Sequence, residues 1–179
     1  ELILRHGYDL VYTPHVVSEK LFEISGHLEN FAESMFGAVE VEGARYRLKP
    51  MNCPGHCHHF SLRKRSYREL PIRYAEFSRL HRNERSGTLT GLSRVRSMAQ
   101  DDAHIFCEPE QVDAELDSFF EMTREIYEVL GIEGVEVLVS TRPEQFTGEP
   151  ADWDAAEQVP QPDEFIGLDR KLYVSKSDV

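Results

Sequence analysis

The chain has 179 residues, and its 32 acidic and 20 basic side chains give a formal net charge of -12 at pH 7. This length corresponds to about one domain and can bury a core without disulfide bridges. The negative total argues against nonspecific nucleic-acid binding by the surface as a whole. The three cysteines, an odd number, argue against a secreted disulfide framework and favour a reducing compartment. No stretch approaches the roughly 20 apolar residues of a membrane helix and no signal peptide opens the chain, so we expect a soluble, cytoplasmic protein.

Charge is strongly segregated along the chain. Residues 61–96 carry arginines and one lysine with few acids, whereas residues 101–168 are dominated by Asp and Glu. Arginine is favoured where phosphates must be held bidentately, so the basic segment is a candidate phosphate-binding region. A general arginine-rich nucleic-acid module would bind any RNA in a salt-sensitive way, an alternative that the acidic total disfavours.

The hydrophobic pattern predicts short elements first and longer ones later. In chain order we expect a helix tail over 1–5, a strand over 8–14 stopped by Pro14, a helix over 16–26, a hairpin over 39–48 with Gly43 in its turn, and a helix over 58–65. These are followed by strands over 72–84 and 95–107 around a polar loop, an amphipathic helix over 110–130 closed by Gly131, and a strand over 134–143. The long hairpin favours an α+β fold, an antiparallel sheet flanked by helices.

A candidate nucleotide site lies in the segment HRNERSGTLTGLSRVR. Neither GxGxxG nor GxxxxGK[ST] occurs in the chain, so a nucleotide would have to be held in another way. Arg82 and Glu84 are expected on one face of a strand, with Arg94 returning on the partner strand across the loop. Three charges would then converge on one pocket. The alternative is a surface ladder of Arg and Glu, which contributes little to stability.

This segment resembles motif 2 of class II aminoacyl-tRNA synthetases, and GYDLVYTP resembles their motif 1, whose terminal proline lies at the dimer interface. KPMNCPGH, RNERSG and RVRSMAQDDAHIFC, in this order, are similar to the threonyl-tRNA synthetases, and the similarity runs from Gly7 to Val139. The resemblance implies that residues 1–179 are one class II catalytic domain, truncated at the C-terminus and lacking motif 3 and the anticodon-binding domain. It also implies ATP-dependent activation of threonine, its transfer to tRNA(Thr), and a homodimer formed through the motif 1 region.

The same resemblance assigns roles around ATP. Arg82 would bind the α-phosphate, Glu84 the adenine amino group and Arg94 the γ-phosphate, so Arg82 and Arg94 are the candidate catalytic residues. Met98 stands where the family usually has an aromatic residue stacked on adenine, and its thioether can cover a base face more loosely. Fixed guanidinium groups and magnesium would stabilise the charge that develops on the phosphate oxygens.

Cys53 and His104 correspond to two of the three protein ligands of the family's zinc, which binds the amino and hydroxyl groups of threonine. Valine is nearly isosteric with threonine, so a metal completed by a hydroxyl separates the two better than an apolar pocket does. Asp102, on the same strand face as His104, matches the residue that accepts the proton of the substrate hydroxyl. The remaining matches to substrate-binding positions are Met51, Gln100 and Tyr173.

Two alternatives remain open at this point. CPGHCHH, residues 53–59, gathers two cysteines and three histidines and could form a self-contained zinc knuckle, although ligands this close do not easily surround a tetrahedral ion. Met98 and the altered C-terminal third also suit a non-catalytic synthetase-like protein that acts as a regulator or binding partner.

Overall fold

The computed structural model describes residues 1–133, 138–144, 146, 148–157 and 173–176, with the side chains of 138–140 and 173–176 left out. Apart from the first two residues, the chain divides into two compact units, 3–106 and 107–179. The interpretation of 1–179 as one domain stays a prediction.

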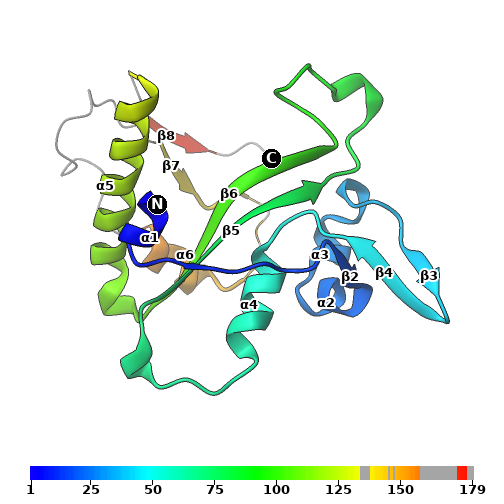
Figure 1. The fold of residues 1–179 in the computed structure, drawn as a ribbon, viewed down its shortest axis with the longest axis horizontal. Coiled ribbons are helices and arrows are strands. Elements are labelled where there is room, and N and C mark those ends of the chain that lie inside the picture. Colours follow the sequence, from blue (N-terminus) through cyan, green and yellow to red (C-terminus); the bar gives the residue numbers. More distant parts are fainter. Residues whose placement is uncertain (134–137, 145, 147, 158–172, 177–179) are drawn as a thin grey trace. The chain divides into compact units, whose positions relative to one another are not determined.

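The first unit is built on the long hairpin (Figure 1). Strands β5 (Ile72–His81) and β6 (Ser97–Phe106) pair antiparallel over ten residues each, from Ile72 opposite Phe106 to His81 opposite Ser97. Strand β1 (Asp9–Leu10) joins the other edge of β5 in parallel. The predicted hairpin is therefore confirmed, with strands that end a few residues before the expected loop.

A second sheet has the order β2 (Val16–Ser18), β4 (Ala44–Leu48) and β3 (Val39–Val41), all antiparallel. Its hairpin turn places Glu42 and Gly43 at φ values of 52° and 79°, as a tight two-residue turn requires. The helix expected over 16–26 was partly wrong, because residues 16–18 pair with β4 and the helix α2 covers only Glu19–Ile24. Two β-branched valines suit a strand, and the long-range pairing takes precedence over local helical spacing.

The other helices of the first unit are short. They are α1 (Leu2–Arg5), α3 (His27–Asn30), α4 (Cys53–Ser61) and the 3-10 turns Ala32–Ser34, Tyr67–Glu69 and Ser86–Thr88. The expected start of α4 at residue 58 was wrong, since the helix begins at Cys53. Pro54 marks no break because a proline in the first helical turn lacks only an N–H that would have no partner there. The earlier start places Cys53 at the helix N-terminus and His56 inside the first turns.

The second unit contains the 3-10 turn Pro109–Gln111, α5 (Val112–Leu130), β7 (Leu138–Thr141), α6 (Pro150–Ala156) and β8 (Tyr173–Lys176). Gly131 ends α5 in the left-handed conformation, with φ 66°, which confirms its predicted role. Strands β7 and β8 pair in parallel. No helix among the residues that the structure describes is long and apolar enough to cross a membrane.

One face of the β5–β6 hairpin is buried under α4. On β5 the buried side chains include Tyr74, Glu76, Ser78 and Leu80, whereas Phe77 and Arg79 are exposed. The ring of Phe60 in α4 stacks on Phe106 of β6, with centroids 4.2 Å apart. The face that α4 covers is thus partly apolar and partly polar.

A buried ion pair lies at the centre of this face. Lys49 Nζ donates to Glu76 Oε1 at 2.8 Å, and the backbone N–H and the hydroxyl of Thr13 donate to the same carboxylate at 3.0 and 2.8 Å. Lys49 is 2% exposed and Glu76 is fully buried. Burial by itself raises the pKa of Glu76, but the hydrogen bonds from Lys49 and Thr13 outweigh it and lower the pKa from 4.5 to about 2.

This pKa predicts acid sensitivity. Because the folded pKa of Glu76 lies below its unfolded value, the stabilisation is present above pH 4.5 and is lost as the pH falls toward about 2. The loss is expected to be roughly 3 kcal/mol in the free energy of unfolding, at about 1.4 kcal/mol per pH unit. Urea unfolding between pH 5 and pH 2 measures it, and Glu69→Gln, at an exposed carboxylate, is the control that leaves most of the loss in place. A free energy of unfolding that stays constant over this range would contradict the prediction.

Candidate functional site

Four predicted site residues share one face of β6. Burial alternates along the strand, and the less exposed positions are Met98, Gln100, Asp102 and His104. These positions lie opposite Leu80, Ser78, Glu76 and Tyr74 of β5. The predicted alternation places all four side chains on the same side of the hairpin as Cys53 and His56 of α4, because His56 contacts both Glu76 and His104.

Asp102 is held by a directed chain of hydrogen bonds. Asn52 Nδ2 donates to Asp102 Oδ2 at 3.0 Å, and Asn52 Oδ1 accepts from the Ser78 hydroxyl at 3.1 Å. The Ser78 oxygen in turn accepts from Lys49 Nζ at 2.8 Å. Since an ammonium can only donate, the direction of every bond down to the carboxylate is fixed. The orientation of Asp102 therefore depends on buried neighbours.

Cys53 and His104 both lie near Asp102. Burial raises the pKa of the Cys53 thiol and the charge of Asp102 raises it further, while the charge of Arg82 opposes the shift. Burial lowers the pKa of His104, and the neighbouring His56 lowers it further. The negative charge of Asp102 raises this pKa but does not outweigh them. Neutral imidazole is the form that binds a metal, and a thiol loses its proton when a metal binds. The site thus gathers a thiol, an imidazole and a carboxylate.

These donors fit part of a zinc site. Thiolate and imidazole are zinc's usual protein ligands, and a catalytic zinc keeps a position open for substrate. Within the part of the chain that the structure describes, no three His, Cys, Asp or Glu side chains are grouped so as to hold an ion by themselves. Cys53 and His104 therefore stay a predicted pair of zinc ligands, which further donors would have to complete.

The alternative of a zinc knuckle in residues 53–59 is not supported. The segment is a helix, so its side chains point in different directions. His56 is fully buried and bonds to Glu76 and His104, whereas Cys57, His58 and His59 are exposed. Four of these groups cannot turn toward one ion without unfolding the helix.

The three predicted ATP-binding charges lie in the loop that connects β5 to β6. Strand β5 ends at His81, so Arg82 and Glu84 follow the strand rather than alternate on its face, and Arg94 precedes β6. The expected strand placement was wrong because only isolated hydrogen bonds cross the loop, such as the Arg82 N–H donating to the Arg96 carbonyl at 2.9 Å, and these do not continue the strand ladder. Arg94 Nε donates to Glu84 Oε2 at 2.9 Å, and the Arg94 side chain is 57% exposed. Two of the three charges therefore meet.

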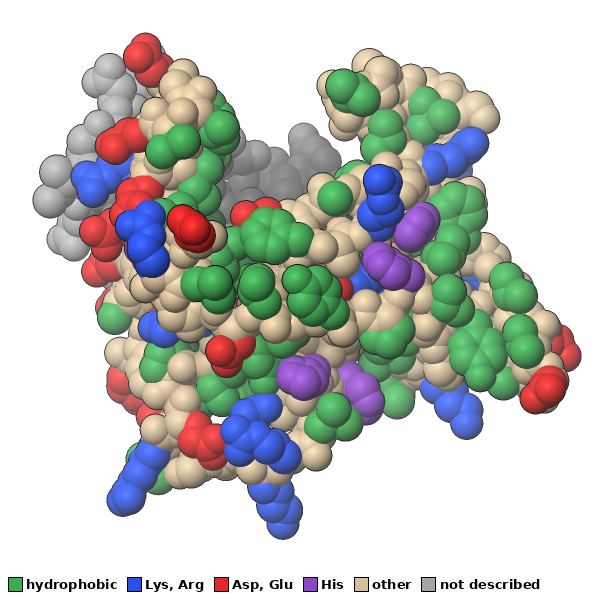
Figure 2. Space-filling view, viewed as in Figure 1, with side chains coloured by type: hydrophobic (Ala, Val, Ile, Leu, Met, Phe, Trp, Pro, Cys, Tyr) green, Lys and Arg blue, Asp and Glu red, His purple; other side chains and the backbone are tan. Residues whose placement is uncertain are grey.

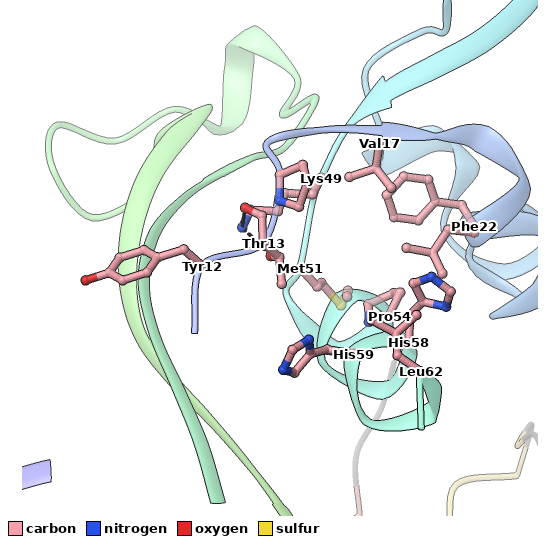
Figure 3. A pocket seen from close by; sticks show the side chains of 13 residues that line it. Tyr12, Thr13, Val17, Phe22, Lys49, Met51, Pro54, His58, His59 and Leu62 are labelled. Carbon is pink, nitrogen blue, oxygen red and sulfur yellow. Dashed lines mark hydrogen bonds between the residues drawn. The ribbon is translucent and has the colours of Figure 1, made fainter. Parts of the chain in front are cut away.

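Met51 lines a separate cavity of about 230 Å³ (Figure 3). Met51, Pro54, His58, Leu62 and Phe22 converge on it, while the ring of Tyr12 points away. None of the other residues predicted for the site from the sequence lies in its wall, which is formed by Tyr12, Thr13, Pro14, Val17, Leu21, Phe22, Lys49, Met51, Pro54, Gly55, His58, His59 and Leu62. The structure therefore places Met51 in a cavity whose wall does not include Asp102.

Comparisons with known proteins identify the family of the chain. The model of the tRNA synthetase class II core domain (G, H, P, S and T) matches residues 38–163. The chain belongs to this family. Its sequence is 52% identical over 153 residues to the cytoplasmic threonine--tRNA ligase of Saccharomyces cerevisiae, covering 86% of this chain and 21% of that protein. It is 50% identical over 150 residues to a threonine--tRNA ligase of Synechococcus sp. (strain CC9605), covering 84% and 24%. The chain thus spans about a fifth to a quarter of the length of these relatives.

Solved structures give the same result for the fold of this class II core domain. A crystal structure titled as the RNA binding domain of threonyl-tRNA synthetase from Cryptosporidium parvum Iowa II aligns with a TM-score of 0.78 and 44% identity, over 87% of this chain and 38% of that one. The Giardia lamblia prolyl-tRNA synthetase aligns with a TM-score of 0.63 at 24% identity, over 72% and 27%, which shows the fold alone. The expected α+β class II fold and the resemblance to the threonyl enzymes are confirmed.

One predicted residue, Tyr173, cannot be placed in the site, and several polar residues near the site were not singled out from the sequence. Tyr173 begins β8 in the second unit, and its side chain lies outside the described residues. The residues missed are the buried Lys49, Asn52 and Glu76 and the half-buried Thr13, and His56 was considered only as a ligand of the zinc knuckle. A charged residue at an inward position of a strand, as Glu76 in YAEFS, is seldom buried unless it is paired, and this signal could have found it.

Proposed function

We propose that the protein is an aminoacyl-tRNA ligase that activates threonine with ATP and transfers it to tRNA(Thr). The observation that carries the proposal is that Cys53 of α4 lies near Asp102 and His104 on one face of the hairpin, beside the charge of Arg82. An apolar amino-acid pocket would need none of these polar groups. The 52% identity to a threonine--tRNA ligase supports the choice of threonine.

Activation makes a bond between the threonine carboxylate and the α-phosphorus of ATP, and pyrophosphate leaves. In our proposal Arg82 stabilises the charge that grows on the α-phosphate, and bound magnesium would supply further positive charge near the pyrophosphate. The ion pair of Arg94 with Glu84 opens when ATP binds, because Arg94 turns to the γ-phosphate and Glu84 to the adenine amino group. An exposed ion pair of this kind costs about 1 kcal/mol or less to break. Met98 covers a face of the adenine ring.

Threonine is selected over valine by its hydroxyl. Cys53 and His104 would hold zinc, which when bound supplies an electron-pair acceptor for the amino and hydroxyl groups. Asp102 accepts the hydrogen bond of the hydroxyl, and Asn52 keeps the carboxylate aimed at that position. Gln100, one step along the same face, contacts the rest of the amino acid, whereas Met51 lines the separate cavity beside α4.

We propose that the protein forms a homodimer through the motif 1 region. Leu10, Tyr12 and Val16 flank Pro14 and are 40%, 76% and 56% exposed, which is unusual for large apolar side chains so close together. Hydrophobic side chains gather on the face seen in Figure 2 along the segment that follows α1. Light scattering of the gene product tests the proposal, and a monomer at micromolar concentration would contradict it. We also infer a cytoplasmic location, as for the yeast relative.

The proposed activity is tested by ATP–pyrophosphate exchange with the full-length gene product. We expect exchange with threonine and little exchange with valine, because valine offers no hydroxyl to the site. Serine is the informative third substrate, since its hydroxyl should allow measurable exchange. Absence of exchange with all three, in a protein that still binds tRNA, would favour the non-catalytic alternative that Met98 suggests.

A further inference from the structure

A continuous line of hydrogen bonds runs from the buried core to His104. Glu76 Oε2 lies 3.0 Å from His56 Nε2, and His56 Nδ1 lies 2.8 Å from His104 Nδ1. The two imidazole rings are nearly perpendicular, with centroids 4.6 Å apart. Glu76 and His56 are fully buried, so water does not compete for either bond. Neither residue belongs to the substrate or ATP positions of the proposed site.

The protons on this line can be assigned from its buried end. Glu76 Oε1 accepts from Lys49 and from the Thr13 N–H, and Oε2 accepts from the Thr13 hydroxyl and from His56. A carboxylate with these partners can only accept, so the proton lies on His56 Nε2. Lys49 already balances the charge of Glu76, so a second proton on His56 would leave the buried cluster with a net positive charge. Neutral His56 therefore presents a lone pair at Nδ1.

The assignment continues to His104. Two ring nitrogens 2.8 Å apart form a bond only if one donates, and since His56 Nδ1 accepts, His104 Nδ1 carries the proton. Asp102 Oδ1 is 3.9 Å from this nitrogen, too far to compete for the proton. His104 then has its lone pair on Nε2, the nitrogen that faces away from His56.

We infer that Glu76 and His56 are positioning residues that fix the tautomer and ring orientation of His104, so that Nε2 is the nitrogen presented to a metal. That the ligand of Nε2 is a metal ion rests on the proposed function. The tautomer of His104 rests only on the hydrogen bonds. The line is rigid because Glu76 is tied to Lys49 and Thr13 at 2.8 to 3.0 Å. Thr13 comes from the segment that ends at Pro14, so the backbone of the motif 1 region also contributes to the orientation of His104.

Two variants of His56, each with an amide in place of one ring nitrogen, separate this role from simple packing. The amide of His56→Asn reaches the position of Nδ1 and can accept from His104, whereas the amide of His56→Gln reaches the position of Nε2 and keeps only the bond to Glu76. Both replace the ring by an amide and leave a similar void. We expect His56→Gln to weaken metal binding by roughly 10- to 100-fold, and His56→Asn to stay within about threefold of the parent protein.

The measurement is made on the full-length gene product. Cobalt titration followed by its thiolate absorption gives the affinity, with Cys53→Ala as the control that removes the site, and thermal unfolding shows whether the variants remain folded. If the parent protein binds no cobalt at Cys53, the zinc part of the proposed function fails. If it does bind and the Gln and Asn variants have equal affinities, the positioning role is wrong.

A second measurement uses the parent protein alone, without substitutions and without metal. Solid-state ¹⁵N NMR of histidine-labelled protein, without metal, distinguishes the two tautomers of His104 from their nitrogen shifts and couplings. We expect protonated Nδ1 and unprotonated Nε2 for His104, with the reverse arrangement at His56. A His104 ring protonated on Nε2 would overturn the inference, whether or not the protein activates threonine.

Discussion

Replacing Arg82 with alanine is expected to lower the rate of threonine activation by roughly a hundredfold or more. Arg82 follows the end of β5 and is anchored through its backbone N–H on Arg96 and through Nε on the Pro50 carbonyl at 3.4 Å. A guanidinium fixed in this way needs little reorganisation when charge develops on the α-phosphate. Its contribution is therefore larger in the transition state than in the ground state, and threonine binding should change far less than the rate.

Single-turnover kinetics of adenylate formation in the full-length gene product measure the effect. Arg85→Ala is the matched control, because Arg85 lies in the same loop, is 84% exposed and makes only a 3.4 Å surface contact with Glu33. This control should stay within about twofold of the parent rate, as expected for an exposed ion pair. If Arg82→Ala kept the parent rate and changed only the apparent affinity for ATP, Arg82 would position the nucleotide and would not stabilise the transition state.

The second large effect is expected at Asp102. Removing its carboxylate leaves the threonine hydroxyl without its acceptor in a closed pocket, at a cost of about 1 to 3 kcal/mol. Asp102→Ala should therefore reduce threonine activation by roughly one to two orders of magnitude. Valine has no hydroxyl to satisfy, so its slow activation should change little, and the threonine-to-valine ratio should fall.

The neighbouring carboxylate supplies the control. Asp101 lies on the opposite, exposed face of β6, so Asp101→Ala removes the same charge from the strand without touching the site. Pyrophosphate exchange and metal content are measured together on both variants. A loss of metal in Asp102→Ala, or an equal drop for threonine and valine, would mean that Asp102 supports His104 and does not read the substrate. Such a supporting role is common for carboxylates near metal-bound histidines.

The sequence by itself determined the elements whose signals are local. Alternation along SMAQDDAHIF placed Asp102 and His104 on one face, because side chains in a strand point to opposite sides in turn. Gly43 and Gly131 marked a turn and a helix end, since both positions need backbone angles that glycine adopts without strain. The class II resemblance also came from contiguous motifs.

Tertiary structure decided what depends on contacts between distant residues. Residues 16–18 became a strand because β4 pairs with them, and His56 became a core residue because Glu76 and His104, 20 and 48 positions away, bond to its two nitrogens. Met51 lines a cavity whose wall does not include Asp102, although both come from segments that match one pocket in the family. Hydrogen bonding of buried polar groups must be completed within the fold, and the partners that complete it are chosen by the packing of α4 on the hairpin, which no local pattern encodes.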